Sequence, residues 1–179
     1  SYTFPSRSRR IENALYGNGF NLYARVKIKI LQIGKTKEKW IQQGIQMYLT
    51  RLEPYLKIEV EEIPSVSILN ADSQDMVKAK EASKCLKRIN SDDYVILLDE
   101  QGEEQTSLEF ANFLANLSEN KKIVFIIGGA YGTHQSIKEI SNYSLKLSAM
   151  TFTHEMVRLI LLEQLYRAEM INHNRPYHY

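Results

Sequence analysis

Strand-like and helix-like segments alternate along this chain from Val26 onward, and this alternation limits the possible folds more than any other feature. The strand-like segments are short and either alternate apolar with polar residues or are apolar throughout. The segments between them repeat apolar residues every three to four positions. Each helix that joins two parallel strands must cover a face of their sheet. The pattern therefore predicts an α/β fold with a mostly parallel sheet and helices on both faces.

The individual elements follow from the same two periods. Lysines alternate with apolar residues from 26 to 30, which predicts a first strand with one solvent-exposed face. Trp40 and Ile41 start the apolar face of the next helix and are expected to be buried. Thr106 and Glu109 have the spacing of a capping box. Strands are expected at 26–34, 57–63, 94–99, 123–127 and 144–148, and helices at 38–52, 72–89, 106–117, around 137–140 and at 153–171.

The first 25 residues differ from the rest in charge and pattern. They hold 4 of the 23 basic residues and 1 of the 21 acidic residues, which leaves 19 basic and 20 acidic residues in 26–179. The net charge of +2 is therefore no argument for nucleic-acid binding, which would need a local basic patch. We treat residues 1–25 as an N-terminal appendage, either a leader, a tag or an organellar presequence, and 26–179 as a single domain.

Cysteine and histidine usage excludes several kinds of site. The single cysteine, Cys85, cannot form an internal disulfide, and its helical spacing with apolar neighbours predicts a buried thiol rather than a nucleophile. No apolar run reaches the roughly 18 residues of a membrane-spanning helix. We expect no metal site, because the histidines are scattered. They are His134, His154, His173 and His178.

A run of five apolar residues, Ile123 to Ile127, leads directly into Gly128 and Gly129, with Gly132 close behind. Ligands of parallel sheets bind beyond the carboxyl ends of the strands, and glycine lets a ring or ribose approach the main chain. The spacing is G-G-x-x-G rather than G-x-G-x-x-G, so a dinucleotide fingerprint is not indicated. Two interpretations stay open, a nucleotide site and a tight turn that needs glycine for its own geometry.

The last helix is apolar on nearly every side, so it must be covered on two faces. Its own sheet can cover one face, and the partner of a homodimer is the simplest cover for the other. Arg158 stands among these apolar residues near the end that carries the glycine turn. It can serve either in a buried structural ion pair or in a contact with a phosphate or cofactor.

Five blocks occur in order along the chain: "KIKILQIGK", "LLDEQG", "FIIGGAYG", "LSAMTFTHEMVRLILLEQLYRA" and "PYHY". Together they resemble the ribosomal RNA large-subunit methyltransferase H family, which belongs to the SPOUT class. The resemblance covers residues 26–179, and members of the family begin about where Val26 stands. It implies a trefoil knot in the C-terminal half (the SPOUT or α-β knot fold), a homodimer, and S-adenosylmethionine as methyl donor. It further implies a substrate, N3 of a pseudouridine in large-subunit ribosomal RNA of assembled ribosomes, and hence a cytoplasmic or, with a presequence, organellar location.

The resemblance also implies which residues bind the cofactor. Leu98 and Leu147 are expected to enclose the adenine, while peptide groups of the following loop bind its edge and the ribose. Two positions depart from the family pattern: Thr153 replaces a proline and Glu169 an aromatic residue. We expect these changes to affect the start of the last helix and the RNA-facing surface, not the pocket. The implied cofactor residues are Leu98, Gly128, Leu147, Ser148, Ala149, Met150, Thr151 and Phe152.

Methyl transfer to an imide nitrogen requires that its proton be removed and that the developing anion be stabilised. His154, Arg158, Tyr177 and His178 are the candidates for this chemistry, and for each histidine a surface or capping role is the alternative. The tail "NHNRPYHY" is rich in aromatic and basic side chains and has no acid, which suits RNA contact but also a frayed terminus. Lysines 35, 37 and 39 can add to an RNA-binding surface or lie in a solvated loop.

Two other functional classes are consistent with the fold. A nicotinamide or flavin oxidoreductase would need an acidic residue for the ribose after the second strand, where Glu61 and Glu62 stand. A non-catalytic ribosome-binding protein would bind RNA without consuming a cofactor.

Overall fold

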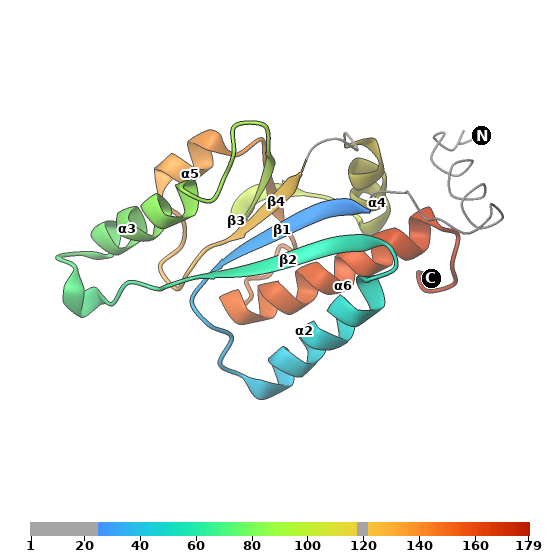
Figure 1. Cartoon of the computed structure of the whole chain (residues 1–179), viewed down its shortest axis with the longest axis horizontal. Coiled ribbons are helices and arrows are strands. Elements are labelled where there is room, and N and C mark those ends of the chain that lie inside the picture. Colours follow the sequence, from blue (N-terminus) through green and yellow to red (C-terminus); the bar gives the residue numbers. More distant parts are fainter. Residues whose placement is uncertain (1–24, 118–121) are drawn as a thin grey trace.

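The computed structural model describes residues 25–117 and 122–179. The predicted appendage, apart from Arg25, lies outside the described residues, so its role stays a prediction. Five strands form one sheet in the order β2-β1-β4-β3-β5, and every neighbouring pair is parallel. Figure 1 shows this sheet between two layers of helices. The strands are β1 (Val26–Ile33), β2 (Leu56–Ile63), β3 (Tyr94–Glu104), β4 (Ile123–Ile127) and β5 (Tyr143–Lys146).

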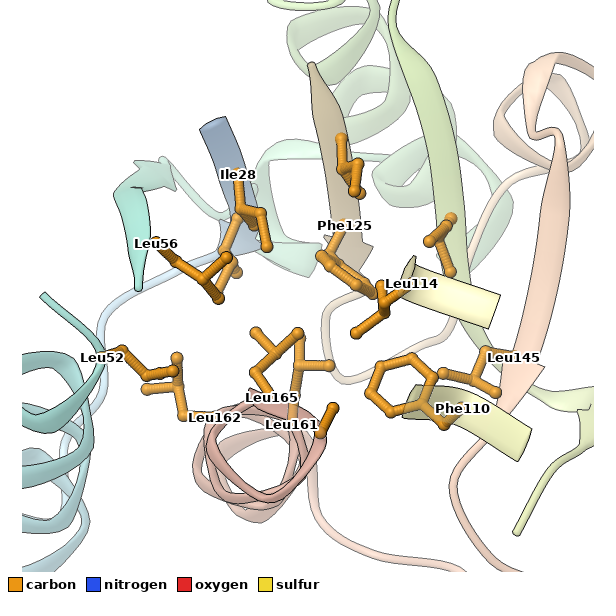
Figure 2. Close-up of a cluster of buried hydrophobic side chains, with 14 of the residues drawn as sticks. Ile28, Leu52, Leu56, Phe110, Leu114, Phe125, Leu145, Leu161, Leu162 and Leu165 are labelled. Atoms are coloured by element: carbon orange, nitrogen blue, oxygen red, sulfur yellow. The ribbon is translucent and has the colours of Figure 1, made fainter. Parts of the chain in front are cut away.

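Helices cover both faces of the sheet, as predicted. On one face α2 (Lys39–Leu52), α4 (Ser107–Asn116) and α6 (His154–Asn172) pack through residues such as Leu52, Phe110 and Leu161 (Figure 2). On the other face α3 (Gln74–Leu86) and α5 (Gln135–Ile140) contribute Cys85 and Ile137. A short 3₁₀ helix, η1 (Ile68–Asn70), precedes α3.

The central strand β4 shows why this arrangement suits the sequence. Its five side chains are all buried, and they alternate between the two helical layers. Phe125 faces the α2, α4 and α6 layer, whereas Val124 and Ile126 face the α3 and α5 layer. A strand covered on both faces needs apolar residues at every position, which explains the continuous apolar run.

The capping box predicted at the start of α4 is confirmed, and α6 also begins with a side-chain cap. Thr106 and Glu109 form a capping box, in which the Thr106 hydroxyl accepts from the Glu109 N–H at 3.1 Å and the Glu109 carboxylate accepts from the Thr106 N–H at 2.7 Å. Thr153, which departs from the family pattern, caps α6 by accepting from the Met156 N–H at 3.2 Å. The hydroxyl thus satisfies an otherwise unpaired donor of the first helical turn.

One expectation is confirmed only in part, and two are wrong. The exposed face of β1 is limited to its start, where Lys27 is exposed. Lys29 is largely buried and pairs with Glu61 at 3.4 Å, because β1 lies between β2 and β4 under both helical layers. Trp40 is 56% exposed, since it lies in the first turn of α2 beside a cleft instead of over the sheet. Glu169 is not on the surface, because the turn of α6 that carries it is buried. The trefoil knot stays a prediction, since strand order and register do not record threading.

Candidate active site

A cleft of about 1140 Å³ opens at the carboxyl ends of the parallel strands. Its walls come from the segments that follow β3, β4 and β5 and from the first turns of α2 and α6. In a parallel sheet these strand ends meet at one edge, where loop N–H groups are not committed to the ladder. The cleft is large enough for a nucleoside cofactor together with part of a second substrate.

The segment after β5 forms one wall of the cleft. Among the described residues, the main chain from Ser148 to Phe152 makes one hydrogen bond, from the Met150 N–H to Ser148 Oγ at 3.0 Å. Its other peptide groups can therefore bind the polar edge of a ligand. Of the eight residues predicted to bind the cofactor, Ala149 does not line the cleft. The seven that do are Leu98, Gly128, Leu147, Ser148, Met150, Thr151 and Phe152.

β3 extends beyond its predicted end because its register with β5 shifts there. Leu98 and Glu103 both pair with Leu145, so the four residues between them bulge out of the ladder. A Cβ atom on Gly102 would lie 2.7 Å from the main-chain oxygen of Ser144, so glycine is needed where the two strands converge. The bulge brings Leu98 and the next three residues, 99–101, to the cleft wall.

The glycine turn after β4 lines the same cleft. The Gly132 N–H donates to the Gly129 oxygen at 3.1 Å, and Gly132 has a φ of +88°, which disfavours residues with a Cβ. A Cβ on Gly128 would lie 2.7 Å from Thr133 Oγ1. The turn thus needs glycine for its own geometry and also borders the ligand site, so the two interpretations from the sequence are compatible.

His154 is the one predicted catalytic residue of the four that lines the cleft. It is half-buried at the first position of α6. Burial, followed by the positive charge of Arg158, lowers the pKa of its imidazole below the usual value of 6.5. The ring is therefore mainly neutral at pH 7, and one nitrogen keeps a lone pair that can accept a proton.

Arg158 lies behind this wall rather than on it. Its side chain is 2% exposed, and it donates from Nη1 to Thr36 Oγ1 at 2.9 Å and from Nη2 to the Ile33 oxygen at 2.6 Å. These bonds tie α6 to the end of β1 through neutral oxygens, not through the carboxylate of an ion pair. A direct contact with a ligand would require the guanidinium to leave them.

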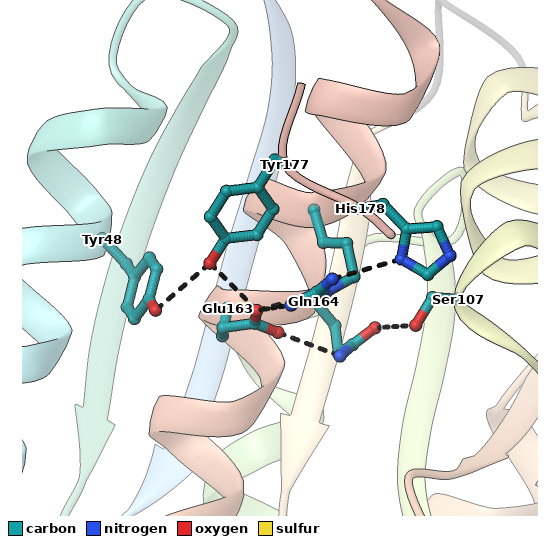
Figure 3. A network of polar contacts seen from close by, with 7 residues as sticks. Tyr48, Ser107, Glu163, Gln164, Tyr177 and His178 are labelled. Carbon is teal, nitrogen blue, oxygen red and sulfur yellow. Dashed lines mark hydrogen bonds and ion pairs between the residues drawn. The ribbon is translucent and has the colours of Figure 1, made fainter. Parts of the chain in front are cut away.

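Tyr177 and His178 lie outside the cleft of their own chain. Figure 3 shows them pointing toward the middle of α6, where Tyr177 donates to Glu163 at 3.0 Å. Arg167 pairs with Glu163 at 2.6 Å, and its Nη1 lies 3.1 Å from His178 Nδ1. Burial and the bonds to Tyr48 and Glu163 raise the pKa of the Tyr177 hydroxyl, so it stays a neutral donor.

Comparison with known proteins decides the family. A family model described as "Predicted SPOUT methyltransferase" matches residues 26–178. The chain is 46% identical, over 156 residues, to the ribosomal RNA large subunit methyltransferase H of Dictyoglomus thermophilum, a match that covers 86% of this chain and 100% of that protein. The chain belongs to this family.

Other members of the methyltransferase H family are similarly close. The protein of Halothermothrix orenii is 44% identical over 158 residues, and that of Kosmotoga olearia is 42% identical over 156 residues. Both matches cover 86% of this chain, and they cover 99% and 100% of those proteins. The chain is therefore a SPOUT-class methyltransferase, and its cofactor is S-adenosylmethionine, the methyl donor of that class.

The geometry of this methyltransferase disfavours the oxidoreductase alternative. Glu61, one of the two acids that would bind a ribose, is engaged by Lys29 and Arg88, and neither Glu61 nor Glu62 lines the cleft. Cys85 is buried as predicted, and burial raises the pKa of its thiol to about 12, which excludes a thiolate nucleophile at neutral pH.

Within residues 25–117 and 122–179, no helix is long and apolar enough to cross a bilayer. The same residues contain no group of three or more histidine, cysteine or acidic side chains arranged to hold a metal ion.

Several residues of the methyltransferase cleft were not predicted. Trp40 and Tyr131 are exposed aromatic residues that line it, and Lys78 and Lys138 line it as well. Tyr131 lies inside the glycine turn and could have been included on that ground. Trp40 was missed because its helical spacing matched the buried face of α2, and no local signal shows that the first turn lies beside the cleft.

Proposed function

We propose that this methyltransferase transfers a methyl group from S-adenosylmethionine to N3 of a pseudouridine in large-subunit ribosomal RNA of assembled ribosomes. The observation that carries the proposal is the convergence, in one cleft, of the loops after three parallel strands with a half-buried, neutral histidine. The names of its relatives specify large-subunit ribosomal RNA as the substrate of those proteins. The target atom and the requirement for assembled ribosomes come from the resemblance of the sequence.

The cofactor would occupy the part of the cleft formed by the strand-end loops. Leu98 and Leu147 provide apolar surfaces for the two faces of the adenine ring. Uncommitted peptide groups between Ser148 and Phe152 suit its polar edge and the ribose hydroxyls. Ala149, which does not line the cleft, would contribute only through the shape of this loop. S-adenosylmethionine supplies the reactive methyl group on its sulfonium.

His154 would accept the proton that the target base must lose. The imide N3 of a pseudouridine carries a proton at neutral pH, so its lone pair is not available for attack. Transfer of that proton to the neutral imidazole lets N3 form a bond to the methyl carbon as the carbon–sulfur bond breaks. The products are the methylated base, S-adenosylhomocysteine and a protonated His154. The lowered pKa of His154 favours later release of this proton to water.

Arg158 would act through His154 rather than on the substrate. Its hydrogen bonds to Thr36 and Ile33 fix the first turns of α6, and its charge adds to the effect of burial in lowering the pKa of the neighbouring imidazole. We assign it a positioning role.

We also propose that the protein is a homodimer. Leu159, Ile160 and Tyr166 of α6 keep part of their apolar surface exposed although α2 and α4 flank the helix. Tyr177 and His178, which do not reach the cleft of their own chain, would then contact RNA or a partner's cleft together with Arg175. Sedimentation velocity should give about twice the monomer mass of 20.8 kDa.

Transfer of tritium from labelled S-adenosylmethionine tests the function directly. Vacant ribosomes, separated subunits and free ribosomal RNA are offered in parallel, and the labelled nucleotide is then mapped. We expect label on a large-subunit pseudouridine in ribosomes. Binding to ribosomes without any transfer would favour the non-catalytic alternative, and transfer to free RNA alone would exclude the requirement for assembled ribosomes.

We propose a cytoplasmic location, where ribosomes and the cofactor meet. An organellar location follows if residues 1–25 direct import, which fractionation of cells that express the full chain with and without these residues would reveal.

A further inference from the structure

The single tryptophan of the chain, Trp40, lines the cleft with 56% of its surface exposed. Tyr131 of the glycine turn lines the same cleft and is 39% exposed. Trp40 lies outside the strand-end loops that would hold the cofactor, and Tyr131 shares the glycine turn with Gly128 but is not itself a predicted cofactor residue. Large aromatic faces left in water inside a ligand cleft are stabilised when a flat ligand covers them.

Trp40 is also held in a fixed place relative to His154. Glu155, the residue after His154, accepts hydrogen bonds through Oε1 from the N–H groups of Lys37 at 2.5 Å and Glu38 at 3.2 Å. These contacts fasten the residues just before Trp40 to the first turn of α6. The aromatic surface and the proposed proton acceptor are therefore preorganised with respect to each other.

Two lysines line the same cleft, whose lining also includes the acidic residues Glu38, Asp99, Glu100 and Glu155. Lys78 pairs with Asp75 at 3.4 Å and Lys138 with Asp99 at 3.7 Å. An ammonium group has three donors, so each lysine can still bind a phosphate oxygen. Sites for single-stranded nucleic acid usually combine aromatic side chains, on which bases stack, with cations that contact the phosphate backbone.

We propose that Trp40 and Tyr131 form a stacking platform for unpaired bases of the substrate RNA, with Lys78 and Lys138 contacting the adjoining phosphates. This inference rests on the proposed function and specifies how the cleft recognises its substrate. Stacking accepts any base, so the platform would secure the RNA strand beside the target, and it would not select the sequence.

Steady-state methylation of vacant ribosomes tests the platform. We expect Trp40→Ala to raise the KM for ribosomes about 5- to 150-fold, the range for loss of a base–aromatic stack. The KM for S-adenosylmethionine should change less than twofold. Trp40→Phe, which keeps an aromatic face, should restore most of the affinity. Likewise, Tyr131→Ala should raise the KM for ribosomes, and Tyr131→Phe should raise it much less.

Leu108→Ala on α4 is the matched control, because Leu108 is also 56% exposed but does not line the cleft. It should leave both KM values unchanged. The platform is excluded if Trp40→Ala behaves like Leu108→Ala, or if it raises the KM for S-adenosylmethionine instead. Unchanged circular dichroism and sedimentation of the variants would show that neither folding nor assembly accounts for the effect.

Fluorescence separates a failure of the platform from a failure of the proposed function. Since Trp40 is the sole tryptophan, its emission reports on this site alone. With S-adenosylhomocysteine bound, a pseudouridine-containing stem-loop RNA should quench the emission as the RNA binds. Quenching without methylation of any ribosome would refute the function but support the platform. RNA that binds by anisotropy without changing the emission would refute the platform.

Discussion

The Nη2 of Arg158 donates a hydrogen bond to the main-chain oxygen of Ile33 at 2.6 Å and so ties the last helix to the end of the first strand. The two residues are 125 positions apart, and a second bond, to Thr36, closes the same junction at 2.9 Å. This tie fixes the helix start that carries His154 at the edge of the cleft. The junction therefore affects both stability and the geometry of the site.

We expect Arg158→Met to lower the free energy of unfolding by about 1–3 kcal/mol, because the buried Ile33 oxygen and Thr36 hydroxyl lose their partner. Urea denaturation followed by circular dichroism measures the loss. Thr36→Val removes one of the two bonds and should cost less, about 1 kcal/mol. Equal stability of Arg158→Met and the parent protein would show that the tie does not contribute.

His154→Gln should lower kcat by about 10²- to 10⁴-fold, the usual contribution of a general base. In the parent protein, kcat/KM should rise with pH and level off at a pKa below 6.5, since burial and Arg158 favour the neutral imidazole. In the variant, kcat/KM should no longer fall as the pH is lowered through this range. Calorimetry should show that it still binds S-adenosylmethionine, and a pH profile that stays the same in the variant would refute the assignment.

Glu81 of α3 is a buried carboxylate, 6% exposed, that packs against the glycine turn. It accepts a hydrogen bond from the Val66 N–H at 3.1 Å, and a Cβ on Gly129 would lie 3.2 Å from its Oε1. Burial raises its pKa above the ordinary value of 4.5. Protonation in the folded state therefore stabilises the protein fully below the unfolded-state pKa, and this contribution is lost as pH rises through the folded-state pKa.

Glu81→Gln should thus be at least as stable as the parent protein at neutral pH, and its advantage should shrink as the pH approaches about 4. Glu81→Ala should lose about 1–3 kcal/mol at either pH, because the Val66 N–H is left unpaired. Urea midpoints measured across this pH range test both expectations. A glutamine variant that is less stable at neutral pH would mean that the ionised carboxylate is the stabilising form.

Gly102 and Gly44 form a matched pair for substitution by alanine. At Gly102 the new Cβ would lie 2.7 Å from the Ser144 oxygen, a main-chain atom that cannot move without disturbing β5. At Gly44, inside α2, it would lie 2.8 Å from Leu159 Cδ1, the end of a flexible side chain. We expect Gly102→Ala to lower the free energy of unfolding by at least about 2 kcal/mol and to weaken cofactor binding.

Gly44→Ala should change stability by less than about 1 kcal/mol, because the better helix propensity of alanine offsets the movement of Leu159. Thermal unfolding and calorimetric titration with S-adenosylmethionine compare the two variants. Similar losses in both would show that the convergence of β3 and β5 imposes no special demand for glycine.

Features that depend on neighbouring residues were predicted correctly from the sequence. The capping box at Thr106 and Glu109 needs only helical spacing, because its hydrogen bonds span three residues. The continuous apolar run from Ile123 to Ile127 was likewise predicted as a strand and forms β4, which is buried on both faces. The assignment of the loop between Ser148 and Phe152 to the cofactor came from resemblance to a family and stays a prediction; the structure adds that most of its peptide groups are uncommitted.

Expectations failed where burial depends on distant segments. The lysines of β1 suggested a solvent-exposed face, but only Lys27 is exposed, because β2, β4 and the helical layers enclose the strand from Ile28 onward. Trp40 has the spacing of a core residue, yet the first turn of α2 lies beside the cleft. Tyr177 and His178 lie along the middle of α6 in their own chain, so their predicted part in catalysis stays a prediction.

The sequence by itself determined the kinds of element, their order and the parallel sheet, because periodicity, caps and turns act over a few residues. Only the tertiary structure decided what Arg158 binds, which aromatic rings line the cleft, and where the C-terminal tail lies relative to it. Those outcomes depend on contacts between residues more than 100 positions apart, such as Arg158 with Ile33 and Glu155 with Lys37. Whether such contacts form is set by the packing of whole layers, which no local pattern encodes.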